Sequence, residues 1–225
     1  MRASRILRLA EEKGTRVLVA LDFLSSEPLR LVEEVEEYVV GAKVGIPFVL
    51  RWGLEAFAEL RDRFGDSLYM LCDFKLADIP EVVAEEVRLI GELGFDGAIL
   101  HLYPGGAERA ARVDRRPELF GLLSMTHAES RLLDLHFEEL VEMARAAGLE
   151  GCVVPATKPH LIREARGRLP HAVLLSPGVG AQGAPIGSAV AVGADFEIVG
   201  RAITSSPDPR SAARAAREAI NRQLK

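Results

Sequence analysis

The sequence predicts an α/β protein folded as a (β/α)8 TIM barrel, and three observations carry this prediction. Eight apolar runs, rich in β-branched residues, recur along the chain. The segments between these runs place apolar residues at the spacing of an amphipathic helix, an alternation typical of parallel strands joined by crossover helices. The length of 225 residues suits eight such units.

The elements can be justified in order along the chain. Arginines interrupt the apolar residues of segment 1–9, which favours a short amphipathic helix over a signal peptide or a membrane span. After the first apolar run, Leu29, Val32 and Val35 recur at the spacing of a helix face. Strands are predicted over residues 17–23, 42–46, 68–74, 97–102, 119–125, 151–156, 172–176 and 196–199.

No linker or shift in composition divides the chain, so we expect a single barrel domain over residues 1–225. The alternative is an open, doubly wound sheet. That fold usually carries a Gly-x-Gly-x-x-Gly fingerprint after its first strand, whereas residues 21–26 read Leu-Asp-Phe-Leu-Ser-Ser. The barrel is therefore the preferred prediction.

Composition excludes several classes of function. The net charge of −5 and the lack of a basic run argue against a nucleic-acid-binding protein. A hydrophobic content of 48% is ample for one large core. Cys72 and Cys152 both lie in apolar stretches, as small buried residues of a reducing compartment do, and we expect a cytoplasmic protein that does not contact membranes.

Charged residues stand at the ends of the first three predicted strands. Asp22 ends the first strand, Lys43 lies on the second, and Asp73 and Lys75 end the third. An ionised group buried at a strand end is costly unless it is paired, so these charges need an explanation. Because the active sites of barrels lie at the carboxyl ends of the strands, we take these residues as candidates for a catalytic site.

The third strand has the most informative pattern, since residues 73–80 read Asp-Phe-Lys-Leu-Ala-Asp-Ile-Pro. Asp73 and Lys75 are two residues apart, so their side chains share one face of an extended strand. The structural alternative is an Asp73–Lys75 ion pair, with Asp78 as the N-cap of the next helix and Glu81 completing a capping box. Only five of 28 basic residues are lysines, and lysine, unlike arginine, can give up a proton, which favours a chemical role for Lys75.

A glycine-rich loop, residues 176–187, follows the seventh strand. Its backbone N–H groups can approach an anion, and the loops after strands seven and eight are the usual phosphate site of barrel enzymes. Gly200 and Arg201 follow the eighth strand, where a guanidinium can bind phosphate through two hydrogen bonds. The alternatives are an ordinary connecting loop and a solvated surface arginine.

Residues 73–80 closely resemble the signature of the orotidine 5'-monophosphate decarboxylase family. Residues 21–22, 43–45, 176–183 and 199–201 resemble the family as well, so the likeness extends over nearly the whole chain. The resemblance implies a (β/α)8 barrel that converts orotidine 5'-monophosphate to uridine 5'-monophosphate and CO2 in de novo pyrimidine biosynthesis. Neither a metal nor an organic cofactor is implied.

The resemblance also implies the catalytic residues. Lys43, Asp73, Lys75 and Asp78 would form a charge network, with Asp78 supplied by the partner subunit of a homodimer. Lys75 would protonate C6 of the pyrimidine as CO2 leaves, and its charge would stabilise the developing carbanion. Asp73 and Asp78 would keep both lysines charged and oriented.

Contacts to the substrate follow from the same resemblance. Asp22 and Lys43 would bind the ribose, Thr126 would face the pyrimidine, and Gln182 would bridge pyrimidine and phosphate when its loop closes. The 5'-phosphate would lie against the residues that follow the eighth strand. The predicted binding set is completed by Ile79, Pro177, Gly178, Gly180, Gly200 and Arg201.

Five positions carry further expectations. Val82 stands where many relatives have a threonine that helps to contact the partner's ribose, so that hydrogen bond would be absent. The segment around Thr126 is one residue shorter than the family pattern. Ile99 and Val153 could line the pocket around the leaving carboxylate, although plain core positions are the preferred interpretation. We expect His101 to be a structural histidine with satisfied hydrogen bonds.

Two rival functions share parts of the pattern. The magnesium-dependent branch of 3-keto-L-gulonate 6-phosphate decarboxylases and hexulose-phosphate synthases has the same Asp-x-Lys-x-x-Asp strand, but a glutamate on the second strand as a metal ligand. Lys43 stands at that position, and a cation there would repel a divalent metal. A catalytically silent phosphate-binding barrel would tolerate loss of the charged residues, yet all of them are present.

Overall fold

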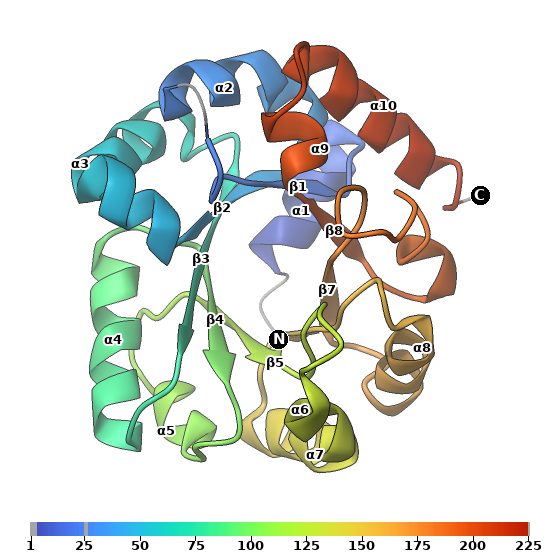
Figure 1. Cartoon of the computed structure of the whole chain (residues 1–225). Helices are drawn as coiled ribbons and strands as arrows, with labels where there is room; N and C mark the ends of the chain where they lie inside the picture. The colour runs from blue at the N-terminus through green and yellow to red at the C-terminus, as the bar shows by residue number, and fades with distance from the viewer. Residues whose placement is uncertain (1–3, 25–26, 225) are drawn as a thin grey trace.

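Eight parallel strands close into a barrel in the computed structural model, which describes residues 4–24 and 27–224 (Figure 1). Each strand pairs with the next one in sequence, and the last pairs with the first, so the (β/α)8 prediction is confirmed. The strands are β1 (Val17–Ala20), β2 (Gly41–Gly45), β3 (Tyr69–Leu76), β4 (Gly97–His101), β5 (Glu118–Leu122), β6 (Gly151–Val153), β7 (Val173–Pro177) and β8 (Phe196–Val199).

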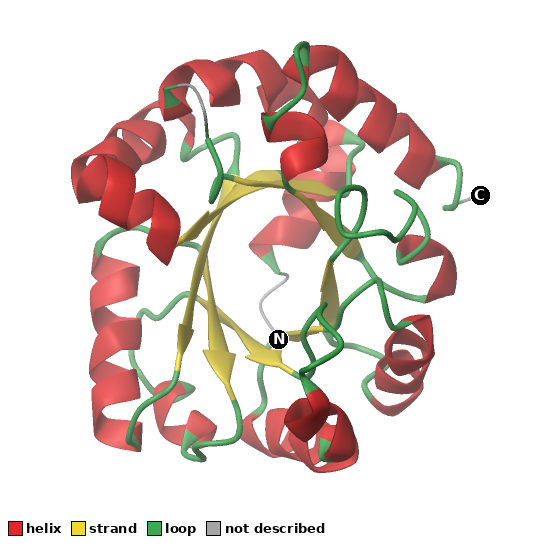
Figure 2. Ribbon diagram, in the orientation of Figure 1, coloured by secondary structure: helices red, strands yellow, loops and turns green. Residues whose placement is uncertain are grey.

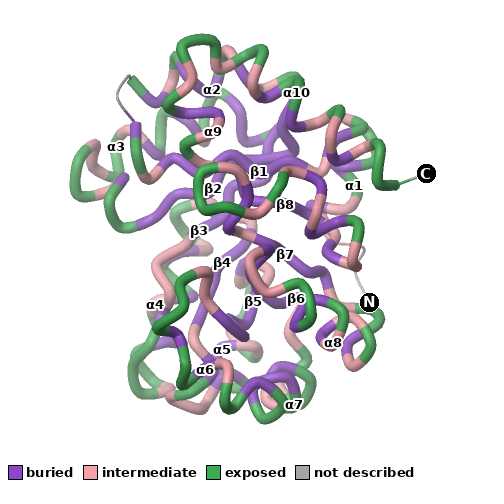
Figure 3. Tube along the Cα trace, turned by 45° about the vertical axis from the view of Figure 1, so that its right-hand side comes forward, coloured by how far each residue is buried: buried purple, intermediate pink, exposed green. Residues whose placement is uncertain are grey.

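Helices surround the barrel on its outside (Figure 2). Because they cover the outer face of the sheet while side chains fill its interior, the strands are apolar on both faces and buried throughout most of their length (Figure 3). The helices are α1 (Arg5–Lys13), α2 (Pro28–Val35), η1 (Glu36–Tyr38), α3 (Ile46–Phe64), α4 (Pro80–Glu92), α5 (Ala107–Ala110), α6 (Arg131–Leu135), α7 (Phe137–Ala147), α8 (Pro159–Arg168), η2 (Val190–Val192), α9 (Arg201–Thr204) and α10 (Pro209–Asn221).

Helix α1 lies across the amino-terminal end of the barrel and is seen behind the strands in Figure 1. The Glu118 carboxylate, at the start of β5, accepts hydrogen bonds from Ser4 Oγ, the Arg5 N–H and Tyr69 OH at 2.9, 2.8 and 2.7 Å. The predicted N-terminal amphipathic helix is thus present over the described part of its segment, and residues 1–3 lie outside that part. The opposite end of the barrel is left for the candidate site.

Strand β3 departs from regular pairing near its end. Its register against β4 shifts between Cys72 and Leu76, and Lys75 has a φ of 51°, in the left-handed region. A residue with a side chain adopts that conformation at a cost of about 1 kcal/mol or more. The irregularity falls on the segment that carries the predicted catalytic residues.

Two predictions about the environment of the chain can be compared with the fold. Cys72 and Cys152 are both free and buried, as expected. Within residues 4–24 and 27–224, none of the helices combines the length and the apolar character that a membrane crossing needs.

Candidate active site

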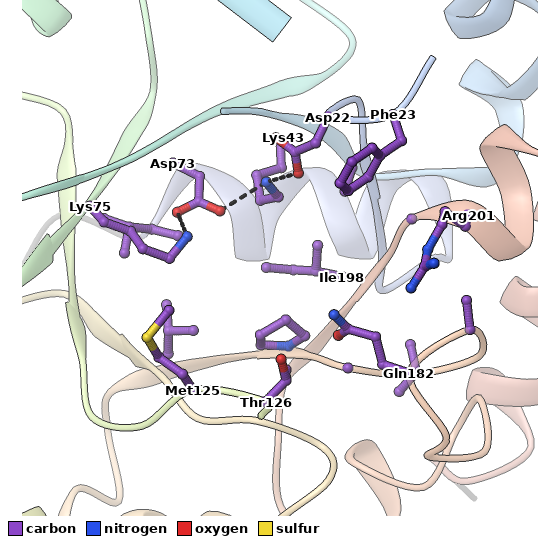
Figure 4. A pocket seen from close by; sticks show the side chains of 18 of the residues that line it. Asp22, Phe23, Lys43, Asp73, Lys75, Met125, Thr126, Gln182, Ile198 and Arg201 are labelled. Carbon is purple, nitrogen blue, oxygen red and sulfur yellow. Dashed lines mark hydrogen bonds and ion pairs between the residues drawn. The ribbon is translucent and has the colours of Figure 1, made fainter. Parts of the chain in front are cut away.

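A pocket opens at the carboxyl ends of the strands, and each of the eight strands contributes to its wall (Figure 4). The wall is charged on the side of β1 to β3 and largely apolar beneath. The residues that line it are Ala20, Asp22, Phe23, Lys43, Asp73, Lys75, Ile99, Leu122, Ser124, Met125, Thr126, Val153, Pro177, Gly178, Val179, Ala181, Gln182, Ile198, Gly200, Arg201 and Thr204.

Four charged side chains form a row of alternating sign along one side of the pocket (Figure 4). Lys43 Nζ lies 2.5 Å from Asp22 Oδ2 and 2.8 Å from Asp73 Oδ2. The other oxygen of Asp73 lies 2.7 Å from Lys75 Nζ. The row therefore runs Asp22, Lys43, Asp73, Lys75, and adjacent strands bring its members together because their carboxyl ends meet at one edge of the barrel.

The electrostatic balance of the row keeps its buried members ionised. Burial lowers the pKa of Lys43, but the carboxylates of Asp73 and Asp22 outweigh burial, so the pKa lies above its ordinary value. Burial likewise raises the pKa of Asp73, but Lys43 and Lys75 outweigh it and hold the pKa below its ordinary value. Both groups are charged at neutral pH, which is the state that mutual pairing favours.

Asp73 and Lys75 both line the pocket, as their spacing predicted. The two lysines differ in access, because the Lys43 side chain is 7% exposed while that of Lys75 is 34% exposed. Lys43 lies between two carboxylates, whereas Lys75 has one carboxylate partner and reaches open space. Lys75 is thus the lysine that a bound molecule can approach.

Asp78 and Ile79 lie on the surface of the chain, and in its described part neither contributes to the pocket wall. Asp78 Oδ1 accepts a hydrogen bond from the Ile79 N–H at 2.7 Å, and Ile79 occupies the N-cap position of α4. The Glu81 carboxylate pairs with Arg109, at 2.7 Å. The capping-box alternative for Asp78 and Glu81 is therefore wrong.

The end of the pocket opposite Lys75 carries Gln182 and Arg201 (Figure 4). Arg201 is exposed and is the first residue of α9, and Gly200 precedes it at the N-cap position. Pro177 also contributes to the wall. This end therefore offers a guanidinium, an amide side chain and loop backbone to an anionic group.

Two glycines of the loop after β7 have different roles. Gly178 lines the pocket with a φ of 102°, and a Cβ there would come within 2.8 Å of Thr126 Cγ2, so only glycine fits. Gly180 was predicted to bind substrate, but it is not a wall residue in the described chain. The Gly180 N–H donates to the Ala184 carbonyl at 2.8 Å, so this group serves the loop's own turn.

Three uncertain positions have clear places in the structure. Ile99 and Val153 both line the pocket and are 2% exposed, so they belong to the wall as well as to the core. Thr126 lines the pocket, and its carbonyl accepts a hydrogen bond from Thr157 Oγ1 at 3.0 Å. The shorter segment thus still presents Thr126 to the pocket.

His101 differs from its prediction. Its Nδ1 atom is buried and has no hydrogen-bond partner among the described residues, so the expectation of a satisfied histidine was wrong. The ring packs edge-on against Tyr103, with the ring centroids 5.0 Å apart. Burial and the charge of Lys75 lower the pKa of His101, which favours the neutral imidazole.

A polar network behind the pocket wall was not predicted. Lys158 Nζ lies 2.6 Å from Asp134 Oδ2, 2.7 Å from Ser130 Oγ and 3.2 Å from Ser124 Oγ. Ser124 is buried, lines the pocket and donates to Asp134 Oδ1 at 2.5 Å. The scarcity of lysine in this arginine-rich chain was the one feature that could have drawn attention to Lys158.

The charged row does not fit a divalent metal. Asp22 and Asp73 are the carboxylates of the row, and the Lys43 ammonium already bridges them. No group of three or more acidic, histidine or cysteine side chains within residues 4–24 and 27–224 is arranged to hold a metal ion. Magnesium prefers a shell of oxygen ligands, and a fixed ammonium among them would repel it.

Comparison with known proteins assigns the chain to a family. The model of the orotidine 5'-phosphate decarboxylase / HUMPS family matches residues 15–216. The chain belongs to this family. Its match runs from the residues just before β1 to α10 and so includes the whole barrel and the whole pocket wall.

Individual relatives in the orotidine 5'-phosphate decarboxylase / HUMPS family cover nearly all of the chain. An orotidine 5'-phosphate decarboxylase from Aeropyrum pernix is 38% identical over 222 residues, which cover 93% of this chain and 90% of the relative. One from Pyrococcus abyssi is 34% identical over 201 residues, covering 88% of this chain and 95% of the relative.

Solved structures of the family share the fold. The orotidine 5'-monophosphate decarboxylase of Sulfolobus solfataricus has a TM-score of 0.84 at 29% identity and covers 94% of this chain and 100% of that one. The Methanocaldococcus jannaschii enzyme, complexed with the inhibitor BMP, has a TM-score of 0.84 at 29% identity and covers 92% of this chain and 99% of that one.

Proposed function

We propose that the chain is a carboxy-lyase that converts orotidine 5'-monophosphate to uridine 5'-monophosphate and CO2 in pyrimidine biosynthesis. Family membership supports this activity. The observation that carries the proposal is the row Asp22, Lys43, Asp73, Lys75 at one end of a pocket whose other end holds Gln182 and Arg201. A molecule with a reacting anionic group at one end and a phosphate at the other suits such a pocket.

The mechanism that we propose centres on Lys75. When CO2 leaves, the electron pair of the broken bond remains on C6 of the pyrimidine, and an ammonium beside that carbon stabilises the negative charge. Lys75 then transfers a proton from Nζ to C6, which completes the product. Asp73, 2.7 Å from Lys75 Nζ, orients the ammonium before the reaction. No step requires a metal or an organic cofactor.

The remaining interactions with the substrate would come mainly from the end of the pocket opposite Lys75. The Arg201 guanidinium and the Gly200 N–H would hold the 5'-phosphate, and Gln182 and Thr126 would contact the pyrimidine side. Asp22 and Lys43 would contact the ribose from the charged row. Energy gained at the phosphate can in this way hold the reacting carbon against Lys75.

The experiment that tests the activity is a spectrophotometric assay for loss of the orotate chromophore, run with and without EDTA. We expect turnover in both conditions. Turnover abolished by the chelator would favour the magnesium-dependent rival, and absence of turnover on orotidine 5'-monophosphate in a folded preparation would refute the proposal.

We further propose a cytoplasmic homodimer in which each pocket receives Asp78 and Ile79 from the partner subunit. Exposed apolar side chains at the amino-terminal ends of α3 and α4 support it, since these ends face the same way as the pocket. Their exposed fractions are 44% for Ile46, 83% for Leu50, 60% for Ile79 and 38% for Val82. Val82 would add apolar area there rather than a hydrogen bond.

Shared sites can be tested by mixing two inactive variants. Lys75→Ala and Asp78→Ala would each be inactive alone, but a hybrid dimer has one site in which both residues are intact. We expect co-refolding to restore up to about one quarter of wild-type activity, since half of the randomly formed dimers are hybrids with one intact site each. Absence of rescue in dimers verified to be hybrids would favour sites built from one chain.

A further inference from the structure

The structure points to Glu197 as a positioning residue for the phosphate-binding loop, acting from outside the barrel and without contact with the substrate. This inference rests on the proposed function, because it concerns how the loop after β7 is held for a phosphate-bearing substrate. Glu197 is on β8 and is fully buried, at 0% exposure.

Three backbone N–H groups bind the Glu197 carboxylate. The Gly187 N–H donates to Oε2 at 2.8 Å, and the N–H groups of Ala189 and Val190 donate to Oε1 at 2.8 and 3.3 Å. Among the described residues no cation pairs with Glu197; burial raises the pKa of this carboxyl group, and the three N–H donors oppose that shift. Three hydrogen bonds to the two oxygens of one buried side chain hold residues 187–190, and the ionised form of Glu197 would make them stronger.

Strand geometry explains how the Glu197 carboxylate, here called the anchor, affects the pocket from the outer face of the barrel. Side chains alternate along a strand, and Ile198 lines the pocket, so Glu197 points outward from the barrel. Glu197 is in register with Ser176 and Ile198 with Pro177, the last two residues of β7. The loop from Gly178 to Gly187 is thus fixed at its start by β7 and at its end by Glu197.

The anchor also decides which N–H groups remain for an anion. The N–H groups of Gly187, Ala189 and Val190 are occupied, and the Gly180 N–H serves the loop's turn. A phosphate is therefore directed to the segment around Gln182 and to Gly200 and Arg201. If the end of the loop were free, this segment would lose its fixed distance from Arg201.

The test compares two substrates in Glu197→Gln, which keeps the shape of the side chain but turns one acceptor into a donor that faces a backbone N–H. We expect kcat/KM for orotidine 5'-monophosphate to fall by about tenfold or more, as loss of one or two such bonds implies. The value for orotidine, which lacks the phosphate, should change by less than about twofold, since an unused phosphate site cannot affect it.

Asp195→Asn is the matched control. Asp195 also accepts a backbone N–H, from Leu174 at 2.8 Å, but it directly precedes β8, and its carboxylate pairs with Arg166 at 2.5 Å. We expect this variant to lose thermal stability without changing the ratio of the two kcat/KM values. A ratio of the two kcat/KM values that is the same in Glu197→Gln as in the wild type would overturn the inference, whether both values fall equally or neither falls.

Hydrogen exchange can be measured on the wild-type protein, so this test does not depend on whether a variant folds. The amides of Gly187, Ala189 and Val190 should be protected before any ligand is added, and rapid exchange there would overturn the anchor. Binding of uridine 5'-monophosphate and of uridine separates the two hypotheses, because Glu197→Gln should weaken only the former. A wild-type protein that binds the nucleotide but does not decarboxylate would refute the proposed function and leave the anchor measurable.

Discussion

Lys43 and Lys75 carry the same charge, yet their surroundings assign them different tasks. Lys43 is nearly buried between the carboxylates of Asp22 and Asp73, so its proton is held by two partners. Lys75 has one partner and a third of its side chain is exposed to the pocket. Lys43 therefore maintains the row, while Lys75 is available to act on a substrate.

This difference in burial and pairing predicts that substitutions of the two lysines have different effects. Lys75→Met should lower kcat by about 10⁴-fold or more, because the proposed mechanism assigns to Lys75 both general acid catalysis and stabilisation of the carbanion. Affinity for uridine 5'-monophosphate, measured by calorimetry, should change by less than about tenfold. Lys43→Met is the comparison: it leaves two carboxylates without their shared cation and should also lower thermal stability. Activity of Lys75→Met within tenfold of wild type would contradict this assignment.

The pKa of Asp73 predicts a pH dependence of stability. Its pKa is lower in the folded than in the unfolded state, so the carboxylate stabilises the fold above its unfolded pKa of about 4 and loses this contribution as pH falls through the folded pKa. The difference in free energy of unfolding between wild type and Asp73→Asn should thus be constant near neutral pH and shrink in acid, as measured by urea unfolding. Asp62→Asn, at an exposed position of α3, should show little difference at any pH.

At the scale of elements, the pocket depends on loops that hold one another. Residues 124–126 form part of the wall after β5, and each has a polar contact from outside it: Lys158 reaches Ser124, Ser130 Oγ reaches the Met125 carbonyl at 3.3 Å, and Thr157 reaches the Thr126 carbonyl. The loop after β6 therefore shapes the wall after β5.

The substitution Lys158→Met tests whether the pocket wall after β5 depends on the loop after β6. The change leaves Asp134 without its cation, and we expect a loss of about 2 kcal/mol in the free energy of unfolding, below the range for fully buried pairs because Asp134 is 30% exposed. KM should rise more than kcat falls, since the wall is displaced while Lys75 is untouched. Lys13→Met, on α1 at the other end of the barrel, is the control and should leave KM unchanged. An unchanged KM in Lys158→Met would show that residues 124–126 keep their positions without the contact from Lys158.

The strands and the charged row could be predicted from the sequence, because both depend on patterns of residues that are close together along the chain. Apolar runs mark strands covered on both faces, and charges at the ends of those runs are conspicuous. Glu197 is a charge inside an apolar run and Lys158 is a rare lysine, but their roles could not be assigned from the sequence because their partners come from other loops. His101 was misjudged for the same reason: hydrogen-bond satisfaction is a property of the packed molecule.

At the scale of the whole molecule, the two ends of the barrel differ: one is closed, and the other carries the pocket. Helix α1 and Glu118 close the amino-terminal end, and the carboxyl-terminal end holds the pocket and the exposed apolar side chains of α3 and α4. A single domain over residues 1–225 stays a prediction, and so does the dimer.

The dimer predicts that one surface substitution acts on a distant function. Leu50→Arg places a charge at the 83% exposed position of α3 and should yield monomers in analytical ultracentrifugation. Activity should fall with dissociation, because the partner's carboxylate would leave the pocket. Leu135→Arg, at a 75% exposed position of α6, is the control and should change neither property. A fully active monomer would contradict shared sites.

The left-handed backbone of Lys75 has a consequence for how this protein can be engineered. A residue with a side chain is strained at a φ of 51°, while glycine is not. Lys75→Gly should therefore unfold at a higher free energy than Lys75→Ala, by about 1 kcal/mol, in chemical denaturation. The chain gives up conformational stability at the position that supplies the proton in the proposed mechanism, so a search for thermostable variants that ignored turnover would be drawn toward removing Lys75.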